Sequence, residues 1–137
     1  MEKITVQTNI NASVEQVWEC YTNPSHIVNW NTALPTWHTP KAENDLQVGG
    51  RFMFRMEAKD GSEGFDFSGE YLEVIPNELL SYKMDDNRIA VVKFMAQDAS
   101  TTVEVTFDTE DQNPVAMQRT GWQSILDNFA RYVESSN

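Results

Sequence analysis

The chain has 137 residues, of which 40% are hydrophobic and 11% aromatic. This length and composition are typical of one globular domain with a substantial core, so we expect a single domain over residues 1–137. The formal net charge is -11, from 21 acidic and 10 basic residues. Such a charge repels nucleic-acid phosphates and anionic lipid surfaces, and we expect neither nucleic acid nor a membrane as a partner.

The N-terminal residues and the cysteine content indicate a cytoplasmic protein. Residues 1–4 lead directly into an alternating pattern, without the continuous apolar segment of a secretory signal. No apolar stretch reaches the roughly 18 residues that a membrane span requires. Cys20 is the only cysteine and cannot form an internal disulfide, which fits a reducing compartment. We interpret it as a small packed residue.

The first thirty residues predict one strand and two short helices. Residues 3–10 alternate between apolar and polar side chains, as in a half-buried strand. Ser13 and Gln16 have the spacing of a capping box, and apolar residues follow at helical spacing: Val14, Val17, Trp18 and Tyr21. Pro24 can occupy the first turn of a second short helix, which carries Ile27, Val28 and Trp30.

The most informative feature of the sequence is a predicted aromatic wall on two adjacent strands. These two strands follow another predicted strand at residues 35–41. Beyond a turn at Asn44, strict alternation places one set of side chains on one face: Phe52, Phe54, Met56 and Ala58. After a turn at residues 59–64 the alternation resumes with Phe65, Phe67, Gly69 and Tyr71. We expect Gly69 at a point where a facing aromatic ring crosses the strand.

The opposite face of these two strands predicts a solvated, charged surface. Arg51 and Arg55 would lie opposite Glu70 and Asp66 in a nearly symmetric hairpin, which favours cross-strand ion pairs. Gly49-Gly50 precedes no helix and no Lys-Ser/Thr pair, so we interpret it as a turn and not as a phosphate-binding loop.

The remaining sequence predicts three further strands and a long helix. Strand patterns cover residues 79–84, 89–96 and 101–107, separated by polar turns typical of a meander. Asn113 is the expected N-cap of the helix, with Pro114 in its first position. Apolar residues then recur at helical spacing: Trp122, Ile125, Leu126, Phe129, Tyr132 and Val133. Helices separated from hairpin-connected strands predict an α+β fold in which this helix covers the wall.

Five segments of the sequence carry a resemblance to a known family. They are Ala12-Ser13-Val14-Glu15-Gln16-Val17-Trp18, Thr22-Asn23-Pro24 with Trp30, Val48-Gly49-Gly50-Arg51-Phe52, Gly69-Glu70-Tyr71-Leu72-Glu73-Val74-Ile75-Pro76, and Gly121-Trp122 through Leu126. In this order they resemble the activator of heat-shock-protein-ninety ATPase homologue-like family, within the START-like SRPBCC helix-grip superfamily. The resemblance spans residues 4–133. It implies a helix-grip, birch-pollen-allergen-like fold: a curved antiparallel sheet around a long C-terminal helix, two short helices after the first strand, and an elongated apolar cavity.

The resemblance implies a kind of pocket but no single activity. The superfamily includes lipid and hormone carriers, polyketide aromatases and cyclases, and co-chaperone domains, and one fold supports many functions. Our leading hypothesis is the binding of a small hydrophobic or amphipathic ligand, without covalent chemistry. The alternatives are a cyclase or aromatase-type enzyme and a chaperone-directed interaction module, and a homodimer is a further possibility.

The candidate ligand-binding residues are those of the wall, its covering helix and one neighbouring strand. They are Trp37, His38, Phe52, Phe54, Met56, Phe65, Phe67, Tyr71, Trp122, Ile125, Leu126 and Phe129. The same residues would serve an ordinary close-packed core, so both interpretations stay open. In a ligand site, Tyr71 and either Trp37 or His38 would orient a polar end of the ligand.

The sequence offers no independent sign of catalysis, metal or cofactor. His26 and His38 are the only histidines, and neither has metal-ligand spacing to another residue. No nucleophile elbow or catalytic triad spacing is present. In the enzyme alternative, His38, Tyr71 or a buried acid would transfer protons inside the cavity.

Overall fold

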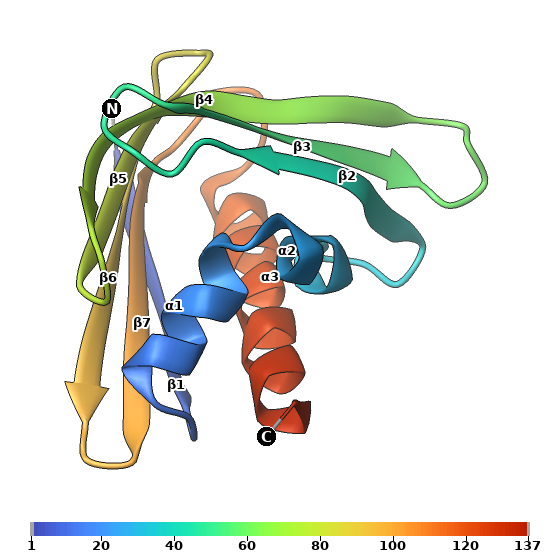
Figure 1. Cartoon of the computed structure of the whole chain (residues 1–137). Coiled ribbons are helices and arrows are strands. Elements are labelled where there is room, and N and C mark those ends of the chain that lie inside the picture. Colours follow the sequence, from blue (N-terminus) through green and yellow to red (C-terminus); the bar gives the residue numbers. More distant parts are fainter. Residues whose placement is uncertain (1, 137) are drawn as a thin grey trace.

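The chain folds into a seven-stranded antiparallel sheet that curves around one long helix (Figure 1). The computed structural model describes residues 2–136. The elements in chain order are β1 (Lys3–Ile10), α1 (Val14–Thr22), α2 (Pro24–Trp30), β2 (Trp37–Asn44), β3 (Arg51–Ala58), β4 (Gly64–Ile75), β5 (Leu79–Met84), β6 (Ile89–Gln97), β7 (Ser100–Asp108) and α3 (Val115–Ser135). This is the expected α+β helix-grip fold.

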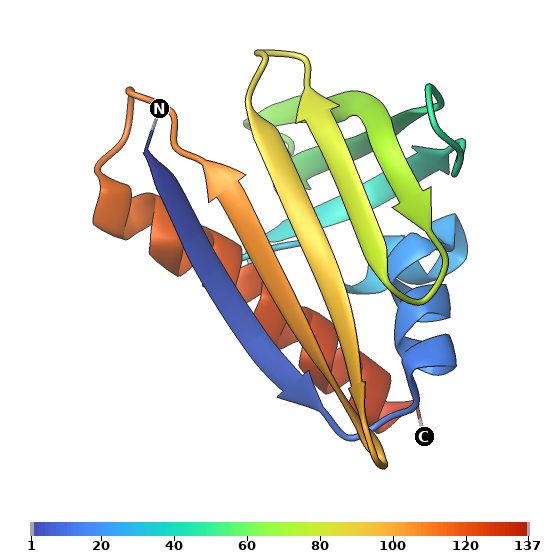
Figure 2. The same ribbon diagram turned by 90° about the vertical axis from the view of Figure 1, so that its left-hand side faces the viewer.

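The short helices connect the two edges of the sheet. The strand order is β1-β7-β6-β5-β4-β3-β2, so β1 and β2 lie at opposite edges. Helices α1 and α2 lead the chain from one edge to the other (Figures 1 and 2). The curvature of the sheet creates a concave side, and α3 lies along it.

Helix α3 is fastened to the β1 edge and to β7. The ring of Trp122 stacks on that of Phe107 of β7, with centroids 4.0 Å apart and planes 9° from parallel. Arg119 and Gln123 donate hydrogen bonds to the backbone carbonyls of Thr5 and Gln7 on β1, at 3.2 and 3.1 Å. These bonds occupy carbonyl groups that an edge strand would otherwise leave unpaired.

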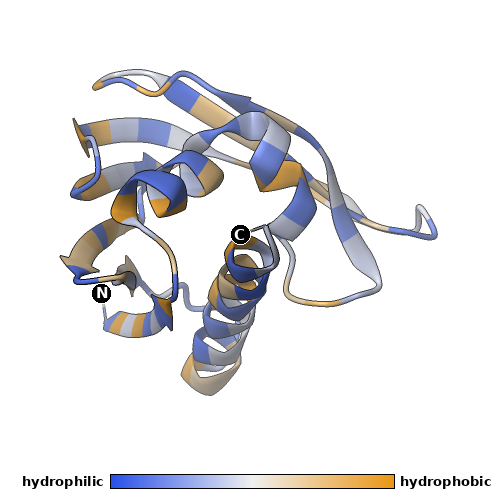
Figure 3. Ribbon diagram, turned by 60° about the horizontal axis from the view of Figure 1, so that its bottom comes forward, coloured by the Kyte–Doolittle hydropathy of each residue, from blue (hydrophilic) through white to orange (hydrophobic). Residues whose placement is uncertain are grey.

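The amphipathic patterns of the sequence explain which faces are buried. Apolar and polar residues alternate in bands along the strands and recur along α3 (Figure 3). On α3 the residues Leu126, Phe129 and Val133 are at most 3% exposed, as expected for a helical stripe that faces a core. No helix within residues 2–136 is long and apolar enough to cross a membrane.

The expected caps hold for the short helices but not for the long one. Ser13 accepts a hydrogen bond from the Gln16 backbone N–H at 3.2 Å, which confirms the predicted start of α1. The predicted cap of α3 was wrong by one residue: Pro114 is the N-cap and the helix begins at Val115. Asn113 instead donates through its side-chain amide to the Glu110 carboxylate at 2.9 Å. Its side chain therefore stabilises the turn that precedes the helix and does not cap the helix.

The predicted aromatic wall forms in the predicted register. Phe52 lies opposite Gly69, Phe54 opposite Phe67 and Met56 opposite Phe65, so all of these residues share the concave face. A Cβ atom on Gly69 would lie 2.9 Å from Cζ of Phe52 and 2.5 Å from the carbonyl oxygen of Lys83. The ring therefore crosses the strand at Gly69, as expected.

The outer face of the wall is charged, also as expected. Arg55 lies opposite Asp66 and is 3.3 Å from it. Arg51 lies opposite Glu70, but its ion pair is with Asp85 at 2.7 Å. Gly49 has a φ of 81°, a left-handed conformation that favours glycine and confirms the turn.

Replacing Gly69 with alanine should destabilise the fold, because the added methyl has no room against Phe52 and the strand β5 backbone. We expect a loss of about 1–3 kcal/mol in the free energy of unfolding, measured by chemical denaturation. Gly121→Ala is the matched control. Gly121 lies within α3 and has no atom within 4 Å of an added Cβ, so this variant should gain about 0.5–1 kcal/mol. Equal effects of the two substitutions would contradict the close approach at Gly69.

Candidate functional site

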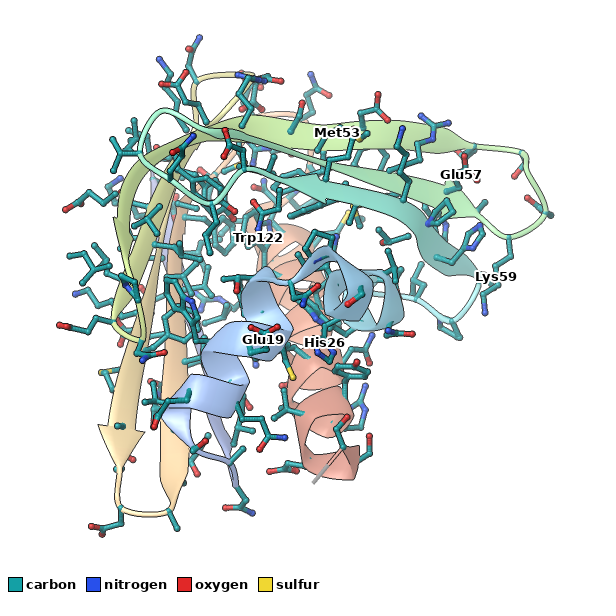
Figure 4. The ribbon with its side chains drawn as sticks, in the orientation of Figure 1. Glu19, His26, Met53, Glu57, Lys59 and Trp122 are labelled. Atoms are coloured by element: carbon teal, nitrogen blue, oxygen red, sulfur yellow. The ribbon has the colours of Figure 1, made fainter. Side chains whose placement is uncertain are left out.

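A cavity of about 260 Å³ lies between the concave face of the sheet and helix α3. Figure 4 shows Trp122 projecting from α3 toward the strands, whereas Met53 of β3 points away on the outer face. The lining is mostly apolar and aromatic. It consists of Tyr21, Trp30, Asn31, Phe52, Phe54, Met56, Phe65, Phe67, Tyr71, Leu80, Tyr82, Arg88, Val105, Trp122, Ile125 and Leu126.

The structure brings nine of the twelve predicted site residues together in this lining. They are Phe52, Phe54, Met56, Phe65, Phe67, Tyr71, Trp122, Ile125 and Leu126. Their placement follows from strand alternation on β3 and β4 and from helical spacing on α3, the two periodicities from which they were predicted. That they bind a ligand stays a prediction.

Trp37 lies beside the cavity and not in its lining. It lines a second, more open hollow of about 330 Å³ and faces Phe65, with ring centroids 6.1 Å apart. The two hollows share the lining residues Met56, Phe65, Trp122 and Ile125. The second hollow therefore adjoins the first and opens it toward the surface.

His38 is not part of the cavity, and its inclusion among the candidates was wrong in this respect. It lies opposite Glu57 on the outer face of the sheet, with Nε2 3.6 Å from the Glu57 carboxylate. Alternation decides this, because the preceding residue Trp37 pairs with inward-facing Ala58. The other histidine, His26, has Nδ1 2.6 Å from the hydroxyl of Tyr132 (Figure 4 labels His26).

Phe129 is likewise absent from the lining. It is fully buried, and its ring packs against those of Trp30 and Tyr21 at centroid distances of 4.7 and 5.1 Å. Phe129 lies one turn beyond Ile125 on α3, where the helix faces α1 and α2 and no longer the sheet wall. Phe129 is therefore part of the packed core and not of the cavity lining.

Seven lining residues were not among the predicted ones. They are Tyr21, Trp30, Asn31, Leu80, Tyr82, Arg88 and Val105. The apolar faces of α1 and α2 and the alternation of β5 and β7 predicted burial for several of them, but not which buried residues would border a gap. Asn31 and Arg88 gave no signal, because polar residues that follow a helix or a turn are usually solvated.

Tyr71 joins three elements around the cavity through hydrogen bonds. Its hydroxyl donates to Oδ1 of Asn44 on β2 at 2.7 Å. The Asn44 amide in turn donates to the carbonyl of Thr22, at the end of α1, at 2.7 Å. These two hydrogen bonds hold the Tyr71 ring in place, and the Tyr71 hydroxyl proton is used in the first of them.

Three tyrosines of the lining stay uncharged. Burial raises the pKa of Tyr21, Tyr71 and Tyr82 above the ordinary value of 10.0, because the phenolate is poorly solvated there. The hydroxyls of Tyr21 and Tyr82 have no hydrogen-bond partner among the described residues. Both groups are thus neutral and able to donate or accept.

Asn31 is the most unusual polar residue of the lining. It is 8% exposed, and its Nδ2 has no hydrogen-bond partner among the described residues. Thr39 donates through its hydroxyl to the Asn31 carbonyl at 2.8 Å and fixes the backbone. Leaving a buried donor unpaired costs about 1–3 kcal/mol, so the unpaired amide of Asn31 destabilises the fold if the residue has only a structural role.

A local irregularity of β2 places Thr39 where it can hold Asn31. The register of β2 against β3 shifts between His38 and Lys41, around Pro40. Proline is tolerated at such bulges on edge strands because it lacks a backbone N–H. Thr39 is only 2% exposed at this bulge, and its hydroxyl reaches the end of α2.

The chemistry of the lining is that of contact and hydrogen bonding. It contains no histidine and no carboxylate. Its one charged residue is Arg88, whose Nε donates to Asp86 at 2.7 Å. Within residues 2–136, no group of three or more histidine, cysteine, aspartate or glutamate side chains is placed to hold a metal ion.

The family model "Activator of Hsp90 ATPase homolog 1-like protein" matches residues 11–134, nearly the whole chain. The chain belongs to this family. No curated protein matches the sequence.

Solved structures agree with the assignment to the AHSA1-like family. The solution structure of the AHSA1-like protein from Aeromonas hydrophila is 45% identical, with a TM-score of 0.93 over 98% of this chain and 94% of that one. The protein Chr148 from Cytophaga hutchinsonii is 42% identical, with a TM-score of 0.84 over 98% and 93% of the two chains. Protein CV1439 from Chromobacterium violaceum shares 23% identity and a TM-score of 0.87 over 98% and 99%, which shows the same fold.

The buried phenols make the stability of this AHSA1-like protein fall at high pH. A phenol with a higher pKa in the folded state keeps its proton where the unfolded chain loses it, so stability is complete below about pH 10 and decreases above it. Tyr82→Phe removes one such group. Between about pH 10.5 and 11.5, the free energy of unfolding of Tyr82→Phe, measured by denaturant titration, should fall less steeply with pH than that of the wild type. The difference in slope should be up to about 1.4 kcal/mol per pH unit. From pH 7 to 9 the free energies of unfolding of the two proteins should change in parallel. Equal slopes of these free energies at high pH would show that Tyr82 ionises normally.

Proposed function

We propose that this protein binds a small hydrophobic or amphipathic molecule in the cavity between its sheet and helix α3. The observation that carries the proposal is the cavity itself, about 260 Å³ within a single small domain. Protein interiors are close-packed, and voids larger than a few water molecules are few and destabilising. A gap of this size among aromatic side chains is therefore best explained by an occupant.

The volume sets the size of that occupant. An apolar cavity of about 150 Å³ accommodates one benzene molecule. The present cavity of about 260 Å³ suits a molecule of two fused rings, on the order of ten non-hydrogen atoms by the same ratio. Larger lipids would need the adjoining open hollow as well.

The adjoining hollow supplies an entrance. Its rim carries exposed apolar side chains, with Leu34 56% exposed, Met117 59% and Phe65 48%. Phe65 and Trp122 border both hollows and separate the rim from the interior. An apolar molecule can rest on the rim before it passes these two rings.

Binding without chemistry fits the lining better than proton transfer does. A general base at neutral pH is usually a histidine or a carboxylate, and the lining contains neither. The buried tyrosines have a raised pKa and retain their protons. They act as hydrogen-bonding groups and not as bases. We further infer that the protein works in the cytoplasm, with Cys20 as a buried free thiol.

Filling the cavity should weaken ligand binding without unfolding the protein. Val105 of β7 lines the cavity, so a phenylalanine at this position can occupy the gap. We expect Val105→Phe to bind indane, a fused two-ring hydrocarbon, at least about tenfold more weakly than the wild type in calorimetric titration. Its free energy of unfolding should change by less than about 1 kcal/mol, since the added ring fills empty space.

Val103→Phe is the matched control for that experiment. Val103 faces the same side of β7 two residues earlier, is fully buried and does not line the cavity. There the larger side chain overpacks the core and should lower the free energy of unfolding by about 1–3 kcal/mol. Failure of the wild type to bind indane or any related two-ring compound up to its solubility limit would count against the proposed function.

A further inference from the structure

The polar groups of the cavity are not spread at random through its lining. Tyr71 lies close enough to Tyr21 to influence its ionisation, and both lie close enough to Tyr82 to influence that of Tyr82. The rings of Tyr71 and Tyr82 are 6.3 Å apart. The Tyr21 ring packs on Trp30 at 5.2 Å, and Asn31 follows Trp30 at the end of α2. Tyr71 and Tyr82 are thus neighbours, and Tyr21 and Asn31 border the same cavity from α1 and from the end of α2.

The hydrogen bonds within the protein use only part of this polar set. Tyr71 donates to Asn44, which fixes its role as structural support. The hydroxyls of Tyr21 and Tyr82 have no partner within residues 2–136. Nδ2 of Asn31 is buried and likewise unpaired. Donor capacity is therefore left over at the cavity, and the Asn31 amide is the buried part of it, although nearly all buried donors in folded proteins have a partner.

The charge of the site argues for an uncharged partner. Arg88 is the one ionised residue of the lining, and it already pairs with Asp86. A carboxylate ligand would have to leave water for an aromatic cavity inside a protein of net charge -11, which is unfavourable on both counts. A neutral acceptor such as a carbonyl oxygen avoids these costs and still accepts from an amide N–H and a hydroxyl.

We propose that the ligand is an uncharged, fused-ring aromatic molecule with a carbonyl oxygen, and that Asn31 donates a hydrogen bond to that oxygen together with Tyr21 or Tyr82. This inference rests on the proposed function and specifies its ligand class. The aromatic part lies among Phe52, Phe67 and Trp122, whose rings favour edge and offset contacts with another ring. Asn31 is then a binding residue that lacks its partner in the ligand-free protein.

A matched pair of probes separates the contribution of the carbonyl group to binding from that of the rings. Indane and indan-1-one have the same two-ring skeleton and differ by one carbonyl group. Both are titrated calorimetrically into the wild type and into Asn31→Leu, which removes the amide and keeps a side chain of similar size. The ratio of the two affinities should fall by about five- to tenfold in Asn31→Leu, while indane alone binds within about twofold of the wild type.

The stability of the same variant gives a second readout. A purely structural asparagine would destabilise the protein when replaced, whereas removal of an unpaired buried amide should leave the ligand-free protein equally or more stable. Asn31→Leu should therefore unfold at an equal or higher temperature without ligand. If this variant does not fold, Tyr21→Phe combined with Tyr82→Phe tests the hydroxyl partner by the same affinity ratio.

The outcomes distinguish the ligand class from the existence of a site. An unchanged ratio in Asn31→Leu overturns the inference, as does tighter binding of indane carboxylate than of indan-1-one to the wild type. In both cases binding of indane would still support the cavity as a ligand site. If neither indane nor indan-1-one binds, the proposed function itself fails.

Discussion

The attachment of helix α3 to one side of the sheet is the constraint on which the rest of the structure depends. Trp122 stacks on Phe107 of β7, and Arg119 and Gln123 bond to the carbonyls of β1. These contacts fix how far the helix stands from the strands. Because the sheet curves, contact with β1 and β7 leaves the helix away from the wall on β3 and β4. The cavity is the consequence of a helix held at one edge of a curved sheet.

The wall itself depends on a close approach of the Phe52 ring to the strand at Gly69. Phe52 lies over Gly69, where any side chain would collide with its ring. The rings of Phe54, Phe67, Tyr71 and Tyr82 then gather around Phe52 at centroid distances of 5.0–5.7 Å. A wall of rings in contact with one another is stiff, so the space in front of it does not collapse easily. Stiffness of the lining is what allows a cavity to persist in a marginally stable fold.

Periodicity in the sequence was sufficient for the wall and the helix that covers it, but not for the cavity's polar groups. Phe52, Phe67 and Trp122 follow from alternation of two and 3.6 residues, which depend on local geometry alone. His38 was misplaced although alternation excludes it, because adjacent strand residues face opposite sides of a sheet and Trp37 pairs with inward-facing Ala58. Asn31 could not be foreseen, since its position depends on a hydrogen bond from Thr39 that closes only in the folded chain.

The apolar contacts of the sheet and helix and the polar groups of the cavity contribute differently to ligand binding. A fold neighbour with 23% identity still superposes with a TM-score of 0.87, so the frame tolerates extensive change in sequence. Apolar contacts of a wall and a helix accept many similar molecules, because they are not directional. An amide donor is directional and costly when unpaired, so it discriminates between ligands of equal size. Within this AHSA1-like frame, selectivity therefore lies with few groups, and Asn31 is the one whose hydrogen-bonding capacity the protein itself leaves unused.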